Sequence, residues 1–374
     1  MLYQPQNAYC ITYDTKGGEE YINATLALVS CFPSNVYITP KPEPIWYFGY
    51  SILRSVMNCM QVLANSSIPW RYVQVVSWND FPLRTNLELV RIFKILNGSQ
   101  DSELLNLDTP DYVTYQWGVH GGTKRSLPPA GLTYYKGSFA NALTRNFIDF
   151  MFTNPISIRF YESLWDSKCA EEFYWPSLVH NIWLNAPGSF PGQCELFYRN
   201  AGEKKPFLSR FQVWEWDKGD RNCKGAWKSL SCIFGVRDMP MLLSRLELVA
   251  HKVYEEFEPA LLYCMEEWYW NRACGNNGNI NWSYYHNLPS VSFGGSELSP
   301  VDISVPYKRS DGRVGHGVVL SDPQWIHQLS PVDIEIPYKR AADRSDDEFG
   351  KRNAVKKFSF DLDLNTWERI SKAG

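Results

Sequence analysis

The segment "SWNDFPLRTNLELVRIFKILNG", residues 77–98, decides the fold class because it runs from the end of a strand into a helix. The β-rich run "WRYVQVVSW", 70–78, predicts the strand, and "NDFP" predicts the turn after it. Thr85 and Glu88, three residues apart, predict a capping box at the start of a helix, which Gly98 ends. The segment therefore predicts a strand–turn–helix unit.

The same alternation of strand and helix precedes this segment. The runs "NAYCITYD" at 7–14 and "NVYITP" at 35–40 are strand-like, and the apolar spacing at 19–32 and 50–65 is helical. Strands that alternate with helices predict a parallel sheet with helices on both faces, that is, an α/β fold. Because ligands bind at the carboxyl ends of such strands, Asp14 and the "SWNDFP" turn lie where a ligand could bind.

Beyond Gly98 the pattern is less regular. Residues 133–154 predict a strand and then a helix, and residues 238–270 predict two helices. The run "EEFYWPSLVHNI", 171–182, predicts a short helix, in which Pro176 is tolerable only near the first turn. These segments continue the α/β pattern toward the C-terminal region.

The C-terminal region contains an internal repeat. The motif "LSPVDISVPYKR" at 298–309 recurs as "LSPVDIEIPYKR" at 329–340. Two copies of a short strand-like motif cannot build a solenoid. We therefore expect residues 276–374 to form an extension outside the core, irregular in part.

Composition and charge limit the classes of partner. The formal net charge of the 374-residue chain is −3, and no run of Lys and Arg resembles a basic arm, which argues against nucleic acid as a partner. Aromatic residues make up 15% of the chain, and their flat rings suit sugar faces as well as cores. Because the net charge is negative and no basic run is present, an anionic ligand would have to be bound by a few local cations.

Cysteines and glycosylation sequons predict the cellular compartment. Nine cysteines accompany four sequons, at Asn23, Asn65, Asn97 and Asn281, which favours an oxidising lumen. However, the chain has no apolar run of about 18 residues and its start lacks the pattern of a signal peptide. Either the environment is cytosolic, or an N-terminal segment is missing from this sequence.

Two adjacent acids in "CAEEFYWPSL", 169–178, are candidate catalytic residues. Neighbours on a helix point about 100° apart, so only one of Glu171 and Glu172 can face a cleft. Two acids that serve opposite faces of a sugar lie about 5 Å or more apart across a cleft, which argues against a glycosidase. The structural alternative is that both acids only favour the positive end of the helix.

Several segments match the motifs of one known family in the same order. Residues 77–98 resemble its G-x-DFP-[IL]-[KR]-[ST]-N-x-E segment, "PQNAYCITYD" resembles "PQNxYCIHVD", and "CAEEFYWPSL" resembles "PDExxWATL". The segments "NCM", "SRFQVWEW", "SCIFGVRDMP" and "LVAHKVYEEFEPALLYC" also occur in family order. The chain thus resembles the core-2/I-branching β-1,6-N-acetylglucosaminyltransferase family over roughly residues 1–275, and the resemblance stops before the repeat.

This resemblance implies a fold and an activity. The implied fold is a nucleotide-sugar transferase domain at 1–275, a GT-A-like, Rossmann-like mixed sheet between helices. The implied reaction is inverting transfer of N-acetylglucosamine from UDP-N-acetylglucosamine to a glycan or glycoprotein acceptor, with a β-1,6 linkage and without a metal ion or other cofactor. The implied location is the Golgi membrane with the catalytic domain in the lumen. The anchor, the stem and the first strand of the sheet would then lie in a missing N-terminal segment.

The resemblance assigns the catalytic base and the phosphate-binding cations. The family's catalytic glutamate falls on Glu172, which would take the proton of the attacking hydroxyl. Its phosphate-binding Lys, in a helix, matches Lys252, although a helical Lys is usually a solvated surface residue. Its phosphate-binding Arg falls on Ser229, so the nearest cation is Lys228, and Arg237 is a further candidate to compensate.

The resemblance also assigns residues to the nucleoside and the acceptor. Asp14 and Tyr47 match uracil- and ribose-side residues, although a strand-end cap and a core aromatic are commoner roles for such residues. Glu103, Trp214 and Trp216 match acceptor-contacting residues, and Trp216 replaces a Tyr. The basic pair that the family places after its glutamate is absent, and its positions hold Asp111 and Thr114.

The cysteines are also assigned by the resemblance. It pairs Cys10 with Cys59 and Cys223 with Cys232, and it gives Cys31 and Cys264 partners upstream of this chain. The remaining cysteines have no family counterpart, and a bridge between two of them, Cys169 and Cys194, is one possibility. The alternative is that some of the three cysteines without a counterpart, Cys169, Cys194 and Cys274, are buried free thiols.

Two other functions stay open from the sequence. A peptide O-xylosyltransferase shares the fold but uses UDP-xylose and a serine acceptor, so donor assays would separate it. An inactive, glycan-binding relative would bind UDP without transfer, and Glu172→Gln would change nothing in it. The absent Arg and the absent basic pair favour this second alternative.

Overall fold

The computed structural model describes residues 1–105, 128–165, 167–192, 207–215, 223–275 and 280–294, and the backbone of two further strands. Its N-terminal part follows the predicted order of strands and helices. The elements are β1 (Tyr9–Ile11), η1 (Thr15–Gly17), α1 (Glu19–Cys31), β2 (Val36–Ile38), α2 (Tyr50–Asn65), β3 (Tyr72–Gln74), β4 (Asp80–Pro82) and α3 (Asn86–Leu96). The helices predicted at 19–32, 50–65 and 86–98 are thus confirmed, with α1 and α3 ending one and two residues early.

The capping box of α3 forms as predicted. The Thr85 hydroxyl accepts the Glu88 N–H at 3.4 Å, and the Glu88 carboxylate accepts the Thr85 N–H at 2.9 Å. Asn97 ends the helix with φ 43°, in the left-handed region. Glu88 also accepts a 2.6 Å hydrogen bond from Arg272, which ties the start of α3 to a helix far along the chain.

The second half of the described chain contains more strands than the sequence predicts. Its first elements are η3 (Pro129–Gly131), β5 (Ala142–Thr144), α4 (Arg145–Thr153), α5 (Pro155–Ser163), α6 (Glu171–His180) and η4 (Ile182–Leu184). The following elements are β6 (Phe211–Gln212), β7 (Ala226–Lys228), β8 (Ser231–Ile233), η6 (Val236–Asp238), α8 (Met239–Leu243), β9 (Val249–His251), α9 (Pro259–Ala273), α10 (Trp282–His286) and α11 (Pro289–Gly294).

The strands form small mixed sheets and not one parallel sheet. Two pairs are parallel, β1 with β2 and β6 with β9, whereas β3–β5, β4–β9 and β7–β8 are antiparallel. The α/β prediction is therefore confirmed. The parallel sheet expected from the alternation of strands and helices is wrong, whereas the mixed pairing implied by the resemblance is present in these small sheets. The physical reason is that several connections are hairpins or long returns, and neither type requires a parallel partner.

The central sheet, β4–β9–β6, corrects two predictions of local structure. The "DFP" of the predicted turn is strand β4, which pairs with β9 through Asp80 and His251. Residues 249–251, predicted to be helical, are β9, the middle strand, and are entirely buried. A short buried apolar run has no periodicity that separates helix from strand, so only the pairing with β4 and β6 decides it.

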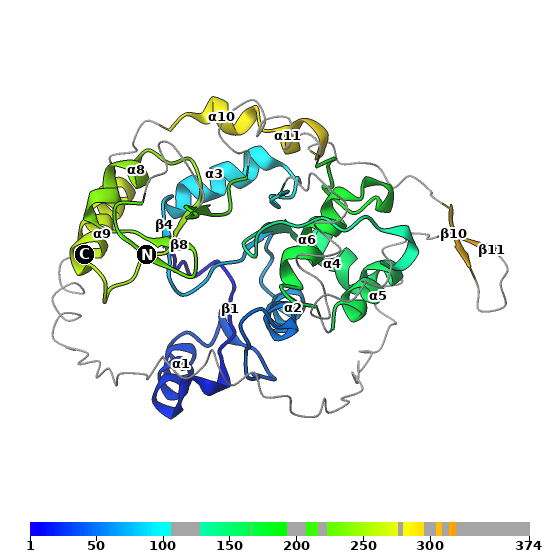
Figure 1. The fold of residues 1–374 in the computed structure, drawn as a ribbon, viewed down its shortest axis with the longest axis horizontal. Coiled ribbons are helices and arrows are strands. Elements are labelled where there is room, and N and C mark those ends of the chain that lie inside the picture. Colours follow the sequence, from blue (N-terminus) through cyan, green and yellow to red (C-terminus); the bar gives the residue numbers. More distant parts are fainter. Residues whose placement is uncertain are drawn as a thin grey trace. The chain divides into compact units, whose positions relative to one another are not determined.

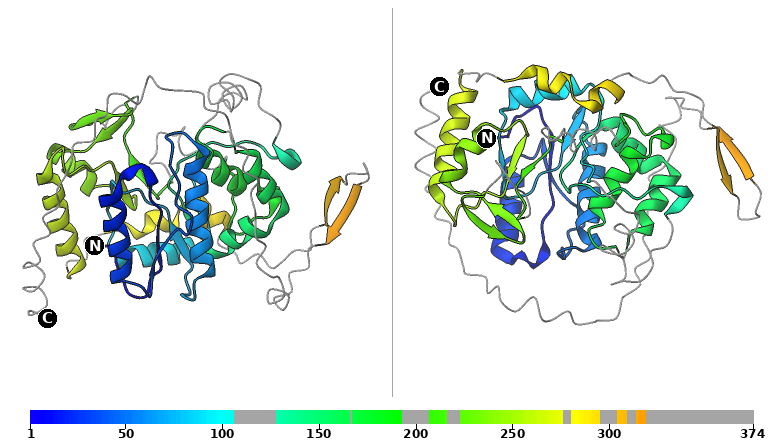
Figure 2. Two further views of the ribbon diagram at one scale, coloured as in Figure 1. Left: turned by 90° about the horizontal axis from the view of Figure 1, so that it is seen from below. Right: turned by 45° about the horizontal axis from the view of Figure 1, so that its top comes forward.

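Three clusters of buried side chains hold the described part together. Figures 1 and 2 show α2, α4, α5 and α6 gathered in one group and α8 with α9 in another. The first cluster lies among the first group and includes Phe147, Phe160, Tyr174 and Trp175. The second joins β4, β6, β8 and β9 to α8 and α9, and the third joins α3 to α10. The helix that carries the two candidate acids is thus part of the largest cluster.

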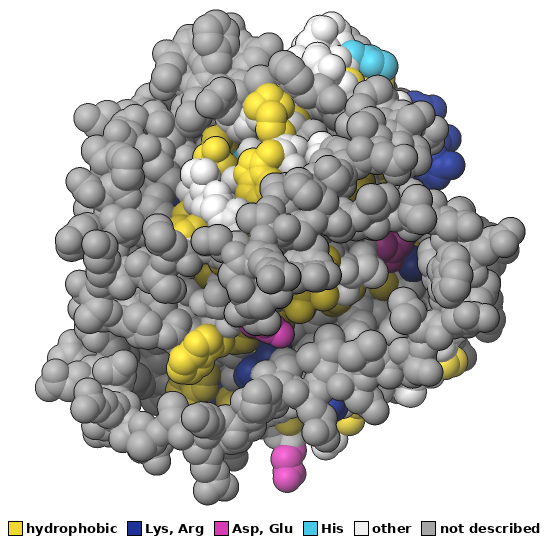
Figure 3. Space-filling model, turned by 90° about the vertical axis from the view of Figure 1, so that its right-hand side faces the viewer, with side chains coloured by type: hydrophobic (Ala, Val, Ile, Leu, Met, Phe, Trp, Pro, Cys, Tyr) yellow, Lys and Arg dark blue, Asp and Glu magenta, His cyan; other side chains and the backbone are white. Residues whose placement is uncertain are grey.

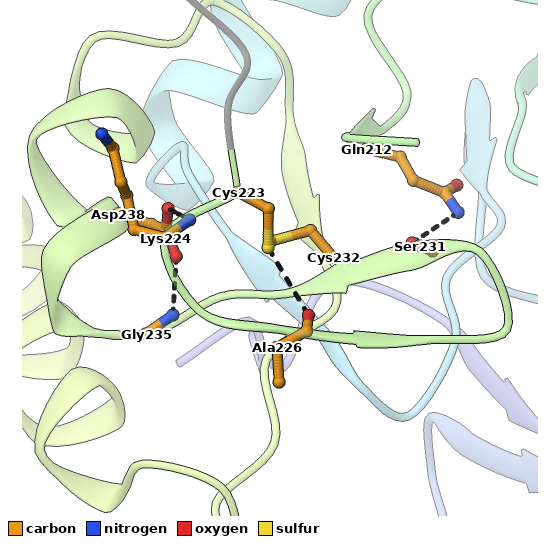
Figure 4. Close-up of a disulfide and its surroundings, with 8 residues drawn as sticks. All are labelled: Gln212, Cys223, Lys224, Ala226, Ser231, Cys232, Gly235 and Asp238. Carbon is orange, nitrogen blue, oxygen red and sulfur yellow. Dashed lines mark hydrogen bonds between the residues drawn. A yellow bond between two sulfur atoms is a disulfide. The ribbon is translucent and has the colours of Figure 1, made fainter. Parts of the chain in front are cut away.

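Both disulfides implied by the resemblance are present. Cys10 is bonded to Cys59, which joins β1 to α2, and Cys223 is bonded to Cys232, which closes the β7–β8 hairpin. Figure 4 shows that hairpin, in which the Asp238 carboxylate accepts the backbone N–H groups of Lys224 and Gly235. The hairpin is therefore fixed at its base by a covalent bond and by two hydrogen bonds.

The other cysteines do not support the proposed additional bridge. Cys169 has a free, buried thiol, so the bridge from Cys169 to Cys194 is not formed, and Cys194 lies outside the described residues. The thiols of Cys31, Cys264 and Cys274 are also free.

Beyond residue 275, α10 and α11 still pack against α3, through buried Tyr285 and Leu288. The first repeat copy contributes β10 (Ser304–Lys308), which pairs with β11 (Val314–Val318), and the second copy lies outside the described residues. On the face seen in Figure 3, described hydrophobic side chains form several separate groups. None of the described helices is both long and apolar enough to cross a bilayer.

Candidate active site

The two adjacent acids of α6 have different surroundings, as the sequence predicts. Glu171 is only 4% exposed, whereas the Glu172 side chain is 24% exposed. Both acids begin α6, where the partial positive charge of the helix favours carboxylates. Glu172 is therefore the acid of the pair that a substrate can reach.

Pro176 does not lie in the first turn of this helix, so that expectation is wrong. It is the sixth residue of α6, and its missing N–H leaves the Glu172 carbonyl without the usual helical donor. The Gly137 N–H donates to this carbonyl at 2.8 Å instead. Pro176 thus links the backbone of Glu172 to a segment outside the helix.

Gly137 fits this position because it has no side chain. A Cβ at Gly137 would lie 1.9 Å from the Glu103 carbonyl oxygen and 2.8 Å from Cγ of Pro176. The first contact is with backbone, which cannot rotate away. Because it has no side chain, Gly137 can lie close to Glu103, Glu172 and Pro176 at the same time.

We expect Gly137→Ala to damage both stability and activity. The free energy of unfolding should fall by about 1–3 kcal/mol because the segment must move away from its neighbours. Any turnover that depends on Glu172 should fall with it because the same shift displaces that side chain. Chemical denaturation and steady-state assays would measure both, with Ser138→Ala as the neighbouring control. Wild-type stability and kcat in Gly137→Ala would contradict this account.

A lysine that sequence reasoning did not single out pairs with Glu172. The Lys136 ammonium donates to the Glu172 carboxylate, and only 7% of the Lys136 side chain is exposed. Burial alone would lower the pKa of Lys136, but the Glu172 and Glu103 carboxylates together raise it. The site therefore contains Glu172, Lys136 and Glu103, although the sequence signal for Lys136 is only a cation between aromatic residues and Gly137.

Glu171 is a buried neighbour with an altered proton affinity. Burial and the adjacent Glu172 charge raise the pKa of Glu171 to about 8, and one of its oxygens, Oε2, has no hydrogen-bond partner among the described residues. Burial also raises the pKa of the Cys169 thiol beside it, as do both carboxylates. Glu171 is thus largely protonated at neutral pH and differs chemically from Glu172.

We expect Glu171 to make stability depend on pH. Its folded-state pKa of about 8 lies above the ordinary value of 4.5, so its contribution to stability is complete below about pH 4.5 and is lost as pH rises through 8. In Glu171→Gln, the free energy of unfolding should fall less steeply between pH 5 and 9, as denaturant titrations would measure. An unchanged slope would show that Glu171 titrates normally.

The predicted phosphate-binding lysines meet at the β7–β8 turn. The Lys252 ammonium donates to the Lys228 carbonyl at 2.8 Å. Burial lowers the pKa of Lys252, and the nearby Lys228 and Arg210 cations lower it further. Lys252 directly follows β9 and is 8% exposed, so its predicted place on a helix is wrong. A buried lysine at a strand end, close to other cations, is well placed to bind an anion.

Tyr47 connects the turn to the acids of α6. Tyr47 is 71% exposed and lies close to the Ser229 side chain. Burial of part of the ring raises the pKa of the Tyr47 phenol, and the nearby Cys169 and Glu172 raise it further. Tyr47 is therefore not a core aromatic, and it lies between Glu172 and the position of the missing Arg.

Asp14 has the local role that the sequence leaves open. Its carboxylate accepts the backbone N–H groups of Lys16 and Ile45, at 3.0 and 3.1 Å, and caps η1. Next to it, the Lys16 ammonium lies 4.0 Å from the ring centre of Trp46, which is 61% exposed. Asp14 thus positions an exposed aromatic segment that continues to Tyr47.

The remaining predicted residues are only partly described. Trp214 follows β6 and pairs through its backbone with Ser231 at the start of β8, close to the turn that bears Lys228. Arg237 lies on η6 and is exposed. The other three predicted positions, Trp216, Asp111 and Thr114, lie outside the described residues.

Two groups of described side chains have the composition of metal ligands. The first contains Cys223, Cys232 and Asp238, but its two sulfurs form a disulfide and are not available as thiolates. The second contains Cys169, Glu171 and Glu172. There, Glu172 already pairs with the Lys136 ammonium. The expected independence from metal stays a prediction.

Comparison with known proteins places this site in a family. A profile of the Core-2/I-branching enzyme family matches residues 1–242. The chain belongs to the Core-2/I-branching enzyme family. The family match includes Glu172, Lys228 and the Cys10–Cys59 and Cys223–Cys232 disulfides, and it ends before Lys252.

Several named relatives of this Core-2/I-branching chain are similar at about 29–30% identity. They include β-1,3-galactosyl-O-glycosyl-glycoprotein β-1,6-N-acetylglucosaminyltransferase 3 of Rattus norvegicus, 29% identical over 290 residues, which are 73% of this chain and 64% of the relative. The same enzyme of Ovis aries is 30% identical over 286 residues, 73% of this chain and 63% of the relative. The β-1,3-galactosyl-O-glycosyl-glycoprotein β-1,6-N-acetylglucosaminyltransferase of bovine herpesvirus 4 is 29% identical over 286 residues, again 73% of this chain and 63% of the relative. The chain thus spans just under two thirds of their length.

Proposed function

We propose that the protein transfers N-acetylglucosamine from UDP-N-acetylglucosamine to a hydroxyl of a glycan acceptor, as a branching enzyme of O-glycans. The observation that carries the proposal is the hydrogen bond from Lys252 to the Lys228 carbonyl at the β7–β8 turn, with Tyr47 close to both Ser229 of that turn and Glu172. A base and a group of cations thus lie near one exposed ring. This arrangement suits a sugar donor whose leaving group is a diphosphate.

In the proposed reaction, Glu172 takes the proton of the acceptor hydroxyl as its oxygen attacks the anomeric carbon of the donor. The new carbon–oxygen bond forms on the face opposite the leaving group, so the configuration inverts. The bond from the anomeric carbon to the diphosphate breaks, and UDP leaves with the electron pair. Lys136 orients the Glu172 carboxylate, and Lys228 with Lys252 meets the charge that develops on UDP.

The finer features of the proposal rest on family membership. We propose a GT-A-like arrangement, a β-1,6 linkage and transfer without a metal ion. We also propose that the chain functions in the Golgi lumen, as part of a membrane-anchored protein. The two disulfides and the named relatives support a secretory enzyme that acts on glycoproteins.

A donor and acceptor assay tests the proposal. The protein would be incubated in a chelator-containing buffer with UDP-N-acetylglucosamine or UDP-xylose, and with a galactosyl-β-1,3-N-acetylgalactosaminyl acceptor or a serine peptide. We expect transfer only of N-acetylglucosamine and only to the disaccharide, with a β linkage by NMR. Xylose transfer to serine would support a xylosyltransferase instead. Binding of UDP without any transfer would indicate an inactive relative, a reading that Ser229 in place of the family Arg favours.

A further inference from the structure

Arg210 is a buried cation whose hydrogen-bonding capacity is not filled. Only 7% of its side chain is exposed, and its Nε and one terminal nitrogen have no hydrogen-bond partner among the described residues. The nearest carboxylate oxygen, Oδ2 of Asp80, lies 3.8 Å from that terminal nitrogen, beyond hydrogen-bonding distance. Buried donors of this kind normally find an acceptor because leaving them unpaired is costly.

Asp80 is not the missing acceptor because its carboxylate lies too far from the guanidinium for a hydrogen bond and is held by other donors. His251 donates to one oxygen at 2.7 Å, and the Ser77 N–H donates to the other at 2.8 Å. Burial lowers the pKa of His251 to about 4, so the imidazole is neutral and donates through its Nδ1–H. Arg210 and His251 in turn lower the pKa of Asp80 in spite of its burial. The carboxylate therefore stays charged and accepts one hydrogen bond at each oxygen.

Arg210 belongs to a group of cations around Lys252. Arg210 and Lys228 both lie close enough to Lys252 to lower its pKa. Arg210, Lys228 and Lys252 thus lie near the end of β9 and the β7–β8 turn. An anion bound there would pair with these three cations.

Arg210 also contacts the chain that follows Gly137. Its guanidinium carbon is 5.3 Å from the ring centre of Phe139, two residues after the Gly137 that bonds to Glu172. The Asp101 carboxylate accepts the Ser209 N–H at 2.6 Å, which fixes the chain just before Arg210. The residues just before β6 thus fix the position of Arg210, near Lys252 and in contact with Phe139.

We propose that Arg210 binds the diphosphate of the sugar donor, together with Lys252 and Lys228, and so replaces the Arg that is absent at Ser229. A guanidinium presents two parallel N–H groups that match two phosphate oxygens, which a lysine cannot do. The proposal rests on the proposed function, since it assigns a residue to the leaving-group side of the same site. It explains how a chain without the family Arg still holds a leaving diphosphate.

Ligand binding to Arg210→Gln tests this role without requiring transfer. Dissociation constants for UDP, UMP and uridine would be measured by calorimetry in the presence of a chelator. The Kd for UDP should rise about 10- to 100-fold because charge-assisted hydrogen bonds are lost. The Kd for uridine, which has no phosphate, should stay within about twofold. Arg210→Lys keeps the charge without the fork and should give an intermediate loss for UDP.

Arg272→Gln is the matched control, because Arg272 is also largely buried and bonded to a carboxylate, that of Glu88, away from this site. It should not change UDP affinity. Wild-type UDP affinity in Arg210→Gln would overturn the role of Arg210 and leave the proposed function intact. An equal loss for UDP and uridine would show a structural role only and also overturn it. Should Arg210→Gln not fold, the same comparison in Arg210→Lys decides the question. No UDP binding by the wild-type protein would overturn the proposed function as well.

Discussion

Glu172→Gln is expected to lower kcat about 10²- to 10⁴-fold and to leave the KM for UDP-N-acetylglucosamine nearly unchanged. The amide cannot take the proton of the acceptor hydroxyl, so the loss arises in the transition state. In the wild-type protein, the Lys136 ammonium contacts the Glu172 carboxylate. Glutamine has the same shape and can still accept a hydrogen bond from Lys136. Initial rates over a range of donor and acceptor concentrations would separate kcat from KM.

Glu171→Gln is the matched control for this experiment. The two acids are adjacent, but Glu171 is buried and largely protonated at neutral pH, because its pKa is raised to about 8. Its amide variant should therefore keep kcat within about fivefold of wild type. A comparable loss in both variants would mean that the packing at the start of α6, and not proton transfer by Glu172, determines the rate.

Lys252→Gln is expected to lower kcat/KM about 10²- to 10³-fold, because the charge on the departing diphosphate loses a fixed cation. Its ammonium is anchored by the Lys228 carbonyl at 2.8 Å, so it cannot be replaced easily by another side chain. Inhibition by the product UDP should weaken in parallel, and Lys252→Arg should restore part of the activity. Rate assays with UDP as an inhibitor measure both effects.

An exposed lysine provides the comparison for Lys252. Lys94 lies in the last turn of α3 and is exposed, so Lys94→Gln should leave kcat/KM unchanged. If Lys252→Gln also kept the wild-type value, the ammonium would have no part in stabilising the leaving group. The cation of the phosphate site would then have to be Lys228 or Arg210.

Local structure and family membership followed from the amino-acid sequence. The capping box of Thr85 and Glu88 depends on residue types at a fixed spacing, and the pairing of the two disulfides was implied by the resemblance to the family. The difference between Glu171 and Glu172 was also predictable, because adjacent residues on a helix must point in different directions. Each of these features depends on interactions within a few residues or on a motif that is read as a whole.

The tertiary structure alone decided which charged groups meet. Lys136 contacts Glu172 across 36 residues, and His251 contacts Asp80 across 171 residues. No short-range sequence pattern indicates either pair, because the contacts depend on how α6 packs on the segment at Gly137 and how β9 pairs with β4. The strand identity of β9 and the unfilled donors of Arg210 have the same origin. Burial and long-range pairing, which only the folded chain defines, set the electrostatics of this site.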